Sequence, residues 1–319
     1  MGRIKEFDEI KGLMIFIVVW YHSIQYICGS VFENPVFDRI NSFNMPVFMI
    51  VSGMFLRKSL AKSHFVVNNA ISLLIPNVFW GILSLLICFA FDTKEMNWGG
   101  VISIPFSCWF LSSLFVCRCV YWLISKTIDK AIVSTVIASS IILFVPGNEY
   151  TKYMMPFVGI GMIIDQGLIL SKDIFKNRLL LFVLLILGTI TLLYWNNEFS
   201  IYGTQNPSWQ SIMGWKEYAI RILYGVLFFF VFYVLFKNLK LPETVENMLI
   251  KLGNNSLGIY VIHFTLLKNI SSVINIDNWV VESLVCFVSA IIITAVVNKA
   301  IYFIKKNRVA SLFMLGVKP

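Results

Sequence analysis

Two of the three histidines in the chain, His22 and His263, fall inside long apolar segments. A neutral imidazole can remove a proton from a reacting hydroxyl group, or it can carry an acyl group itself. His22 follows the basic Lys11 by 11 residues, which is roughly 16 Å along a helix. His263 follows Lys251 by 12 residues, or about 18 Å if one helix joins them. We therefore expect the two imidazoles near one level. A structural hydrogen bond between helices is the alternative role for each.

A charged pair precedes His22 on the same predicted helix. At about 100° per residue, Lys11 and His22 differ by only about 20° around the helix axis, and Asp8 lies within about 60° of Lys11. The three side chains therefore share one face, which indicates a polar track leading from an acid and a base to a mid-membrane imidazole. The alternative is a solvated Asp8–Lys11 pair beside the membrane and a hydrogen-bonded histidine.

The composition places these residues in a membrane protein. Of 319 residues, 58% are hydrophobic and 13% are charged, whereas an average soluble domain has about 25% charged residues. Disorder is excluded, because a chain so rich in apolar residues would not stay solvated. A spanning helix needs about 20 mainly apolar residues. We therefore predict an all-α membrane protein, a bundle of about ten transmembrane helices that forms a single domain over residues 1–319.

The predicted spans occupy residues 12–30, 41–57, 70–91, 101–124, 131–147, 153–170, 179–196, 217–236, 255–274 and 279–304. Asn44, Pro46 and Ser52-Gly53 are expected to interrupt the second of them. An N-terminus on the inside puts 18 of the 26 Lys and Arg residues on the cytoplasmic side and five outside. Cytoplasmic loops carry such an excess, so both termini are predicted to be cytoplasmic. The net charge of +9 then reflects topology, and we expect no nucleic-acid partner.

The six cysteines lie within or at the ends of apolar segments, without the spacing of a zinc site or of a disulfide framework. We expect small packed or lipid-facing residues and no metal. Arg118, Arg221 and Lys299 are the basic residues left inside predicted spans. Ionisable residues at such depth are costly and are functional candidates. Arg118 is expected to contact a substrate or to pair with a carboxylate such as Asp165.

Four motifs, in order along the chain, resemble those of the acyltransferase-3 family of integral membrane acyltransferases. The first runs from Phe7-Asp8-Glu9-Ile10-Lys11-Gly12 to His22, and the second is Asn44-Met45-Pro46-Val47-Phe48 with Ser52-Gly53-Met54. The third is Cys108-Trp109-Phe110-Leu111, and the fourth runs from Leu252 to His263. Together they extend from residue 7 to residue 263.

The resemblance implies transfer of an acyl group, most often acetyl from acetyl-CoA, to a hydroxyl group of a surface glycan or its lipid-linked precursor. His22 aligns with the histidine that is regarded as catalytic in the family, and Asp8 and Lys11 are assigned to the same catalytic track. The family usually has Arg where this chain has Lys11, and Lys lacks the planar bidentate fork of Arg. We expect a stand-alone, multi-pass membrane domain in the plasma or inner membrane, without the esterase-like domain that some members carry.

Donor binding is expected near the inner basic loops, because acetyl-CoA is cytoplasmic and carries several negative charges. Arg57 and Lys58 follow the second motif there, and ordinary positive-inside anchoring is their alternative role. The other expected binding residues are Ser52, Trp109, Arg118 and His263. Of these, Trp109 would offer a stacking surface to a sugar or an acyl arm.

A transporter of a saccharide or a lipid-linked intermediate is the competing function. Transporters often contain paired repeats with interrupted helices in corresponding positions. This sequence predicts an interruption in the second span alone, which favours the enzyme.

Overall fold

The computed structural model describes residues 5–28, 33–90, 108–145, 149–167, 169–171, 173–196, 199, 214–268, 274 and 276–317. The regular structure of these residues is entirely helical, which confirms the all-α prediction. Four helical stretches of the described chain are long and apolar enough to cross a membrane, namely Lys5–Cys28, Phe65–Ile87, Trp215–Asn238 and Trp279–Ile304. Shorter apolar helices are Trp109–Ile124, Ala131–Phe144, Arg178–Tyr194 and Ser256–Lys268.

The helices occur in the order α1 (Lys5–Ser23), the π-helix η1 (Ile24–Cys28), α2 (Pro35–Asn41), α3 (Asn44–Leu60), α4 (Phe65–Asn69), the π-helix η2 (Ala70–Leu74), α5 (Ile75–Ala90), α7 (Trp109–Ile124), α8 (Ala131–Phe144), α9 (Glu149–Gln166), α10 (Arg178–Tyr194), α11 (Trp215–Asn238), α12 (Glu243–Asn254), α13 (Ser256–Lys268), α14 (Trp279–Ile304) and α15 (Arg308–Leu315). Two short 3₁₀-helices, Ile169–Ser171 and Asp173–Lys176, lie between α9 and α10. Each predicted span coincides with a helix over its described part. The parts 29–30, 91, 101–107, 146–147, 168 and 269–273 lie outside the described residues. The number of membrane crossings and the side of the termini stay predictions.

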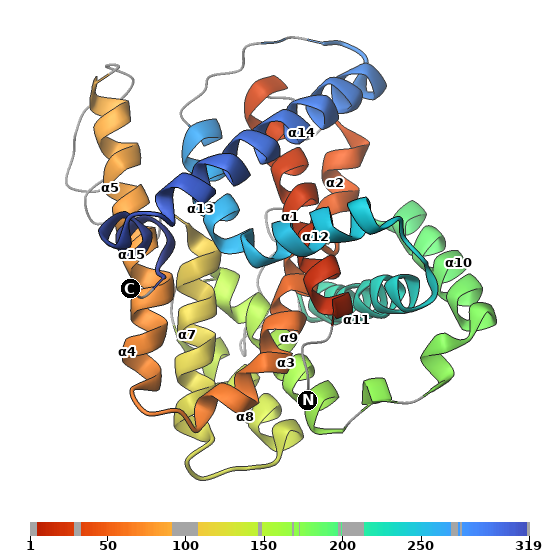
Figure 1. Ribbon diagram of the computed structural model, residues 1–319. Helices are drawn as coiled ribbons and strands as arrows, with labels where there is room; N and C mark the ends of the chain where they lie inside the picture. Colours follow the sequence, from red (N-terminus) through yellow and green to blue (C-terminus); the bar gives the residue numbers. More distant parts are fainter. Residues whose placement is uncertain are drawn as a thin grey trace.

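Helix α1 lies at the centre of the bundle and contacts α3, α11, α12, α13 and α14 (Figure 1). Its apolar side chains Ile10, Met14 and Val19 are fully buried. Since membrane lipid is as apolar as these residues, close packing and hydrogen bonds hold such helices together. Helix α1 is therefore the element that fixes the position of His22.

Glycines allow α12 to cross α1 in direct backbone contact. A Cβ atom on Gly12 would overlap the carbonyl group of Leu249, and one on Gly253 would overlap the carbonyl oxygen of Asp8. Small residues are typical of such close approaches in membranes. The first and fourth motifs therefore meet through their glycines.

Glycines also allow α3 and α9 to pack in direct backbone contact. A Cβ atom on Gly53 would overlap the carbonyl group of Val158, and one on Gly161 would overlap that of Ile50. The predicted interruption of this span is wrong, because α3 is continuous from Asn44 to Leu60. Pro46 lies in the first turn, where a backbone N–H has no intrahelical partner to lose.

The described cysteines, Cys28, Cys108, Cys117, Cys119 and Cys286, are all free thiols. The Sγ atoms of Cys28 and Cys286 nevertheless lie 3.4 Å apart, in contact between η1 and α14. This contact joins two residues that are 258 positions apart, so no spacing rule could have found it.

We predict that Gly161→Ala destabilises the protein by about 1–3 kcal/mol, because the added methyl group must separate α9 from α3. Gly188→Ala on α10 is the matched control, since a Cβ atom there meets its nearest neighbour at an ordinary 3.5 Å. Thermal unfolding of the two variants in detergent tests the prediction, and equal melting temperatures would contradict it.

Candidate active site

The two buried histidines are in direct contact. Nδ1 of His22 lies 2.9 Å from Nε2 of His263, with the ring centres 5.2 Å apart. Nδ1 of His263 lies 2.6 Å from the carbonyl oxygen of Ile259, one turn earlier on α13. A chain of two hydrogen bonds therefore links α1 to the backbone of α13.

The donor and acceptor capacities of these atoms determine which imidazole nitrogens carry hydrogens. The Ile259 carbonyl oxygen can only accept, so Nδ1 of His263 carries a hydrogen. Neutral imidazole has one donor and one acceptor nitrogen, so Nε2 of His263 is then the acceptor. His22 must donate from Nδ1, and its own Nε2 is left with a free lone pair. In this arrangement the acceptor nitrogen that is left over lies on His22.

Access to the pair is asymmetric. His263 is fully buried, whereas 8% of His22 is exposed. The His22 ring lies 5.2 Å from the ring of Phe264 and 6.0 Å from that of Tyr26, centre to centre. His22 is thus slightly less buried than His263.

The predicted reason for the closeness of His22 and His263 is partly wrong. The depth of His263 was expected from a continuous helix beginning at Lys251, but α12 ends at Asn254 and α13 begins at Ser256. The two histidines meet because α12 and α13 both pack against α1.

Asp8 and Lys11 form the predicted pair on one face of α1. Lys11 Nζ lies 2.6 Å from Oδ1 of Asp8, whose side chain is 7% exposed. The ammonium group also lies 5.7 Å from the ring centre of Phe55 on α3. These residues do not reach His22, since 11 helical residues correspond to about 16 Å. Asp8 and Lys11 therefore lie near Phe55 on α3 and away from the two imidazoles.

Basic side chains gather around the end of α3. Arg118 on α7 donates from Nη2 to Oγ of Ser59 at 3.4 Å, and its buried Nε has no hydrogen-bond partner among the residues that the structure describes. Asp165, which was a candidate partner for Arg118, instead lies 3.9 Å from Lys58. Arg57 lies 4.0 Å from Asp129. Both exposed pairs are loose, and such pairs contribute little stability.

The structure places Ser52 half-buried on α3, next to the Gly53 contact with α9. Its hydroxyl group forms no hydrogen bond with His22 or His263 among the described residues. The motif glycine has a clear packing role, whereas the structure brings Ser52 to neither the imidazoles nor Arg118.

Trp109 lines a small cavity of about 30 Å³. The indole stacks on Tyr150 at 4.5 Å between ring centres. The cavity is lined by aromatic side chains that include Tyr153 and Trp195, together with the polar Asn41, Ser42 and Arg221. The Arg221 guanidinium lies 4.2 Å from the ring centre of Tyr153, and its Nε donates to the Phe199 carbonyl oxygen.

Asn77 holds the start of α7 and was missed by the sequence analysis. Its Oδ1 accepts from the backbone N–H of Cys108 at 2.9 Å, and its Nδ2 donates to Oγ of Ser112 at 2.8 Å. The side chain is fully buried. An asparagine within an apolar span was the available signal, since a polar side chain there needs partners.

The comparisons with known proteins agree with the motifs. A family model, described as an acyltransferase domain and specific to the acyltransferase-3 family, matches residues 4–299. The chain is 26% identical over 223 residues to nodulation protein NolL of Mesorhizobium japonicum, covering 63% of this chain and 59% of that protein. It is 36% identical over 81 residues to nodulation protein NolL of Sinorhizobium fredii, covering 23% of this chain and 22% of that protein.

The chain thus spans less than two thirds of the length of these relatives. No solved structure matches significantly. The family match covers nearly the whole sequence and includes all four motifs. The chain belongs to the acyltransferase-3 family of membrane acyltransferases.

Proposed function

We propose that the protein is a membrane O-acetyltransferase that moves an acetyl group from cytoplasmic acetyl-CoA to a hydroxyl group of a cell-surface polysaccharide or its lipid-linked precursor. The observation that carries the proposal is the hydrogen-bond chain from Ile259 through His263 to His22, which leaves the lone pair on Nε2 of His22 free to accept a proton. Family membership supplies the reaction class.

In the proposed reaction, Nε2 of His22 takes the proton of the acceptor hydroxyl as that oxygen attacks the thioester carbonyl. The C–S bond breaks, and the proton passes to the departing thiolate of CoA. While His22 holds the proton, its Nδ1–H donates to a neutral His263 and the charge spreads across the hydrogen bond. Nε2 of His22 could instead attack the thioester and carry the acetyl group to the acceptor. Trapping of an acetyl-imidazole without acceptor would select this second route.

Donor binding is assigned to the basic end of α3. The unpaired Nε of Arg118, the half-exposed Arg57 and the nearby Lys11 offer donors and positive charge to the phosphates of CoA. The loose pairs of Arg57 and Lys58 with carboxylates cost little to break. To pass from Lys11 to His22 along this face of α1, the pantetheine arm would have to displace the buried side chains of Ile15 and Val18.

The acceptor is assigned to the aromatic residues at the start of α7, where the cavity of about 30 Å³ must widen to admit a sugar ring. Trp109 precedes Arg118 by nine residues, so the cavity lies about 14 Å along α7 from the basic cluster. Phe110 lies 5.4 Å from Tyr260, and Tyr260 lies 5.9 Å from His263, between ring centres. Aromatic faces with nearby amide and hydroxyl groups suit a sugar ring. Donor and acceptor would then reach the imidazole pair from opposite sides.

We predict that His22→Ala lowers acetyl transfer by about 10²–10⁴-fold, as expected for loss of a general base. Binding of acetyl-CoA should be retained. Transfer of radiolabelled acetyl groups to glycan by membranes of the variant measures the first effect, and equilibrium binding measures the second. Retained transfer would refute the role of His22.

Two matched variants test His263 as a positioning residue. His263→Gln places an amide near the position of Nε2, where its oxygen can accept from His22. His263→Asn places the amide near Nδ1, where it can satisfy Ile259 but not His22. We predict that His263→Gln keeps substantially more activity than His263→Asn, and that the pH profile of kcat shifts only for the second. Equal loss in both variants would indicate a purely structural histidine.

Arg118→Ala should raise the KM for acetyl-CoA roughly tenfold, because a charged hydrogen bond is worth about 1.5–3 kcal/mol. The KM for the acceptor and the value of kcat should change little. Lys126→Ala is the control, since Lys126 lies two turns further along the chain and stacks on Trp122 at 3.8 Å. An unchanged donor KM in Arg118→Ala would move the donor site elsewhere.

For the acceptor, Trp109→Ala should raise the KM roughly tenfold, because stacking on an aromatic face contributes about 1 kcal/mol or more beyond area burial. Trp109→Phe keeps an aromatic face, so its KM for the acceptor should lie between those of Trp109→Ala and the wild type. Steady-state kinetics with a purified acceptor glycan provide the measurement. A change in the donor KM alone would contradict the assignment.

A further inference from the structure

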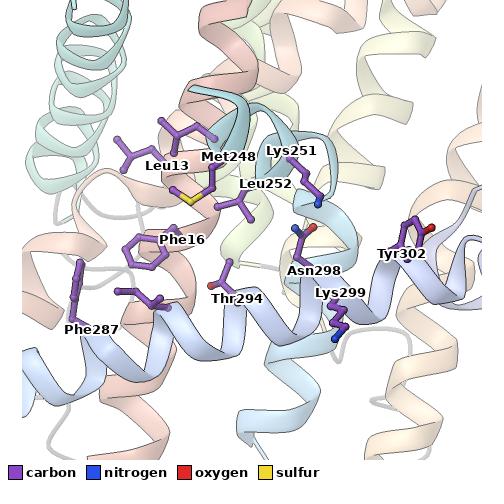
Figure 2. A pocket seen from close by; sticks show the side chains of 13 residues that line it. Leu13, Phe16, Met248, Lys251, Leu252, Phe287, Thr294, Asn298, Lys299 and Tyr302 are labelled. Atoms are coloured by element: carbon purple, nitrogen blue, oxygen red, sulfur yellow. The ribbon is translucent and has the colours of Figure 1, made fainter. Parts of the chain in front are cut away.

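A second, larger cavity opens between α1, α12 and α14, with a volume of about 790 Å³. Figure 2 shows its two ends: Leu13, Phe16 and Phe287 gather at one, and Lys251 and Asn298 lie at the other. Met248 and Ile291, which also line it, are 53% and 48% exposed. The cavity is therefore a groove that is open to its surroundings along an apolar side.

Two lysines at the polar end of the groove have no carboxylate partner among the described residues. Neither Lys251 nor Lys299 has a carboxylate oxygen within 4.0 Å in the described part of the chain. Asn298 accepts from Nδ2 of Asn255 at 2.6 Å through its oxygen, so its own N–H groups are left to donate. These groups together would bind an anion.

A buried hydroxyl group lies further along the same groove. Thr294 is 4% exposed, and its Oγ1 is buried without a hydrogen-bond partner. It lies between the polar end and the aromatic residues, as Figure 2 shows. A buried hydroxyl group that lacks a partner among the described residues costs free energy, and it marks this wall of the groove as one of its few polar positions.

This groove is distinct from the proposed reaction site. Leu13 precedes His22 by nine residues, and nine steps of about 100° turn half-way around the helix. The groove and the imidazole therefore face opposite sides of α1. Phe16 and Trp20 pack edge-on against Phe287 at 5.3 and 5.2 Å, between ring centres, and close the groove at that end.

We propose that the groove binds an anionic phospholipid of the surrounding bilayer. One acyl chain lies along Leu13, Phe16 and Phe287, and the phosphate lies near Lys251 and Lys299. Charge complementarity argues for this occupant, because unpaired lysines above an apolar groove match an anionic headgroup above its chain. Helix α12, which carries Lys251, is fixed to α1 at Gly253, so the lipid would bridge α12 and α14.

Lipid titrations of the purified full-length protein, followed by native mass spectrometry, test the proposal. Phosphatidylglycerol should bind one site at least tenfold more tightly than phosphatidylcholine with the same chains, and sn-glycerol 3-phosphate should not displace it. Lys251→Ala with Lys299→Ala should weaken phosphatidylglycerol binding tenfold or more and leave phosphatidylcholine binding unchanged. Lys130→Ala with Lys240→Ala, at exposed positions away from the groove, is the charge-matched control.

A third variant separates the apolar requirement from the charge. Ala295 lines the groove and is exposed, so Ala295→Trp should fill it without disturbing the core and should abolish binding of both lipids. Equal affinity for the two lipids, or full binding in either groove variant, would overturn the proposal. A wild-type dimer that becomes monomeric in Ala295→Trp would assign the groove to a second copy instead, and would also overturn it.

Discussion

The arrangement of the site depends on one constraint: a backbone carbonyl oxygen cannot donate a hydrogen bond. Because Ile259 can only accept, the tautomer of His263 is fixed, and with it the direction of the hydrogen bond from His22. The free lone pair on His22 is the result. In the proposed mechanism, a neutral imidazole performs the orienting task that a carboxylate performs in the hydrolase triads, without placing a negative charge in an apolar bundle, where charge is costly.

The sequence allowed the fold class, the family and the helix positions to be predicted, because apolar runs and the four motifs are local features. It also allowed the Asp8–Lys11 pair to be predicted, since helix geometry alone sets the spacing of three residues. For His22 and His263, the sequence predicted a similar depth in the bundle but no direct contact. The predicted span of residues 255–274 marks the break between α12 and α13, but the atoms in contact depend on how both helices pack against α1.

Other features depended on tertiary contacts and could not be read locally. Arg118 contacts Ser59 and Asp165 contacts Lys58, so both side chains find their partners at the end of α3. Asn77 and Arg221 gained roles only when helices distant in sequence came together. Pro46 was predicted to interrupt its helix and does not, because a proline interrupts a helix only beyond its first turn. Residue type indicated which positions needed partners, and packing determined which partners they found.

The glycine contacts between α1 and α12 have a mechanical consequence. With no side chains between the two backbones at Gly12 and Gly253, α1 cannot slide or roll against α12 without a steric clash. Helix α13 continues from α12 after one residue. The glycine contacts and the packing of α13 against α1 therefore hold together the helices that carry the two histidines. In the proposed mechanism, the spacing of the two imidazoles would then persist when substrates enter.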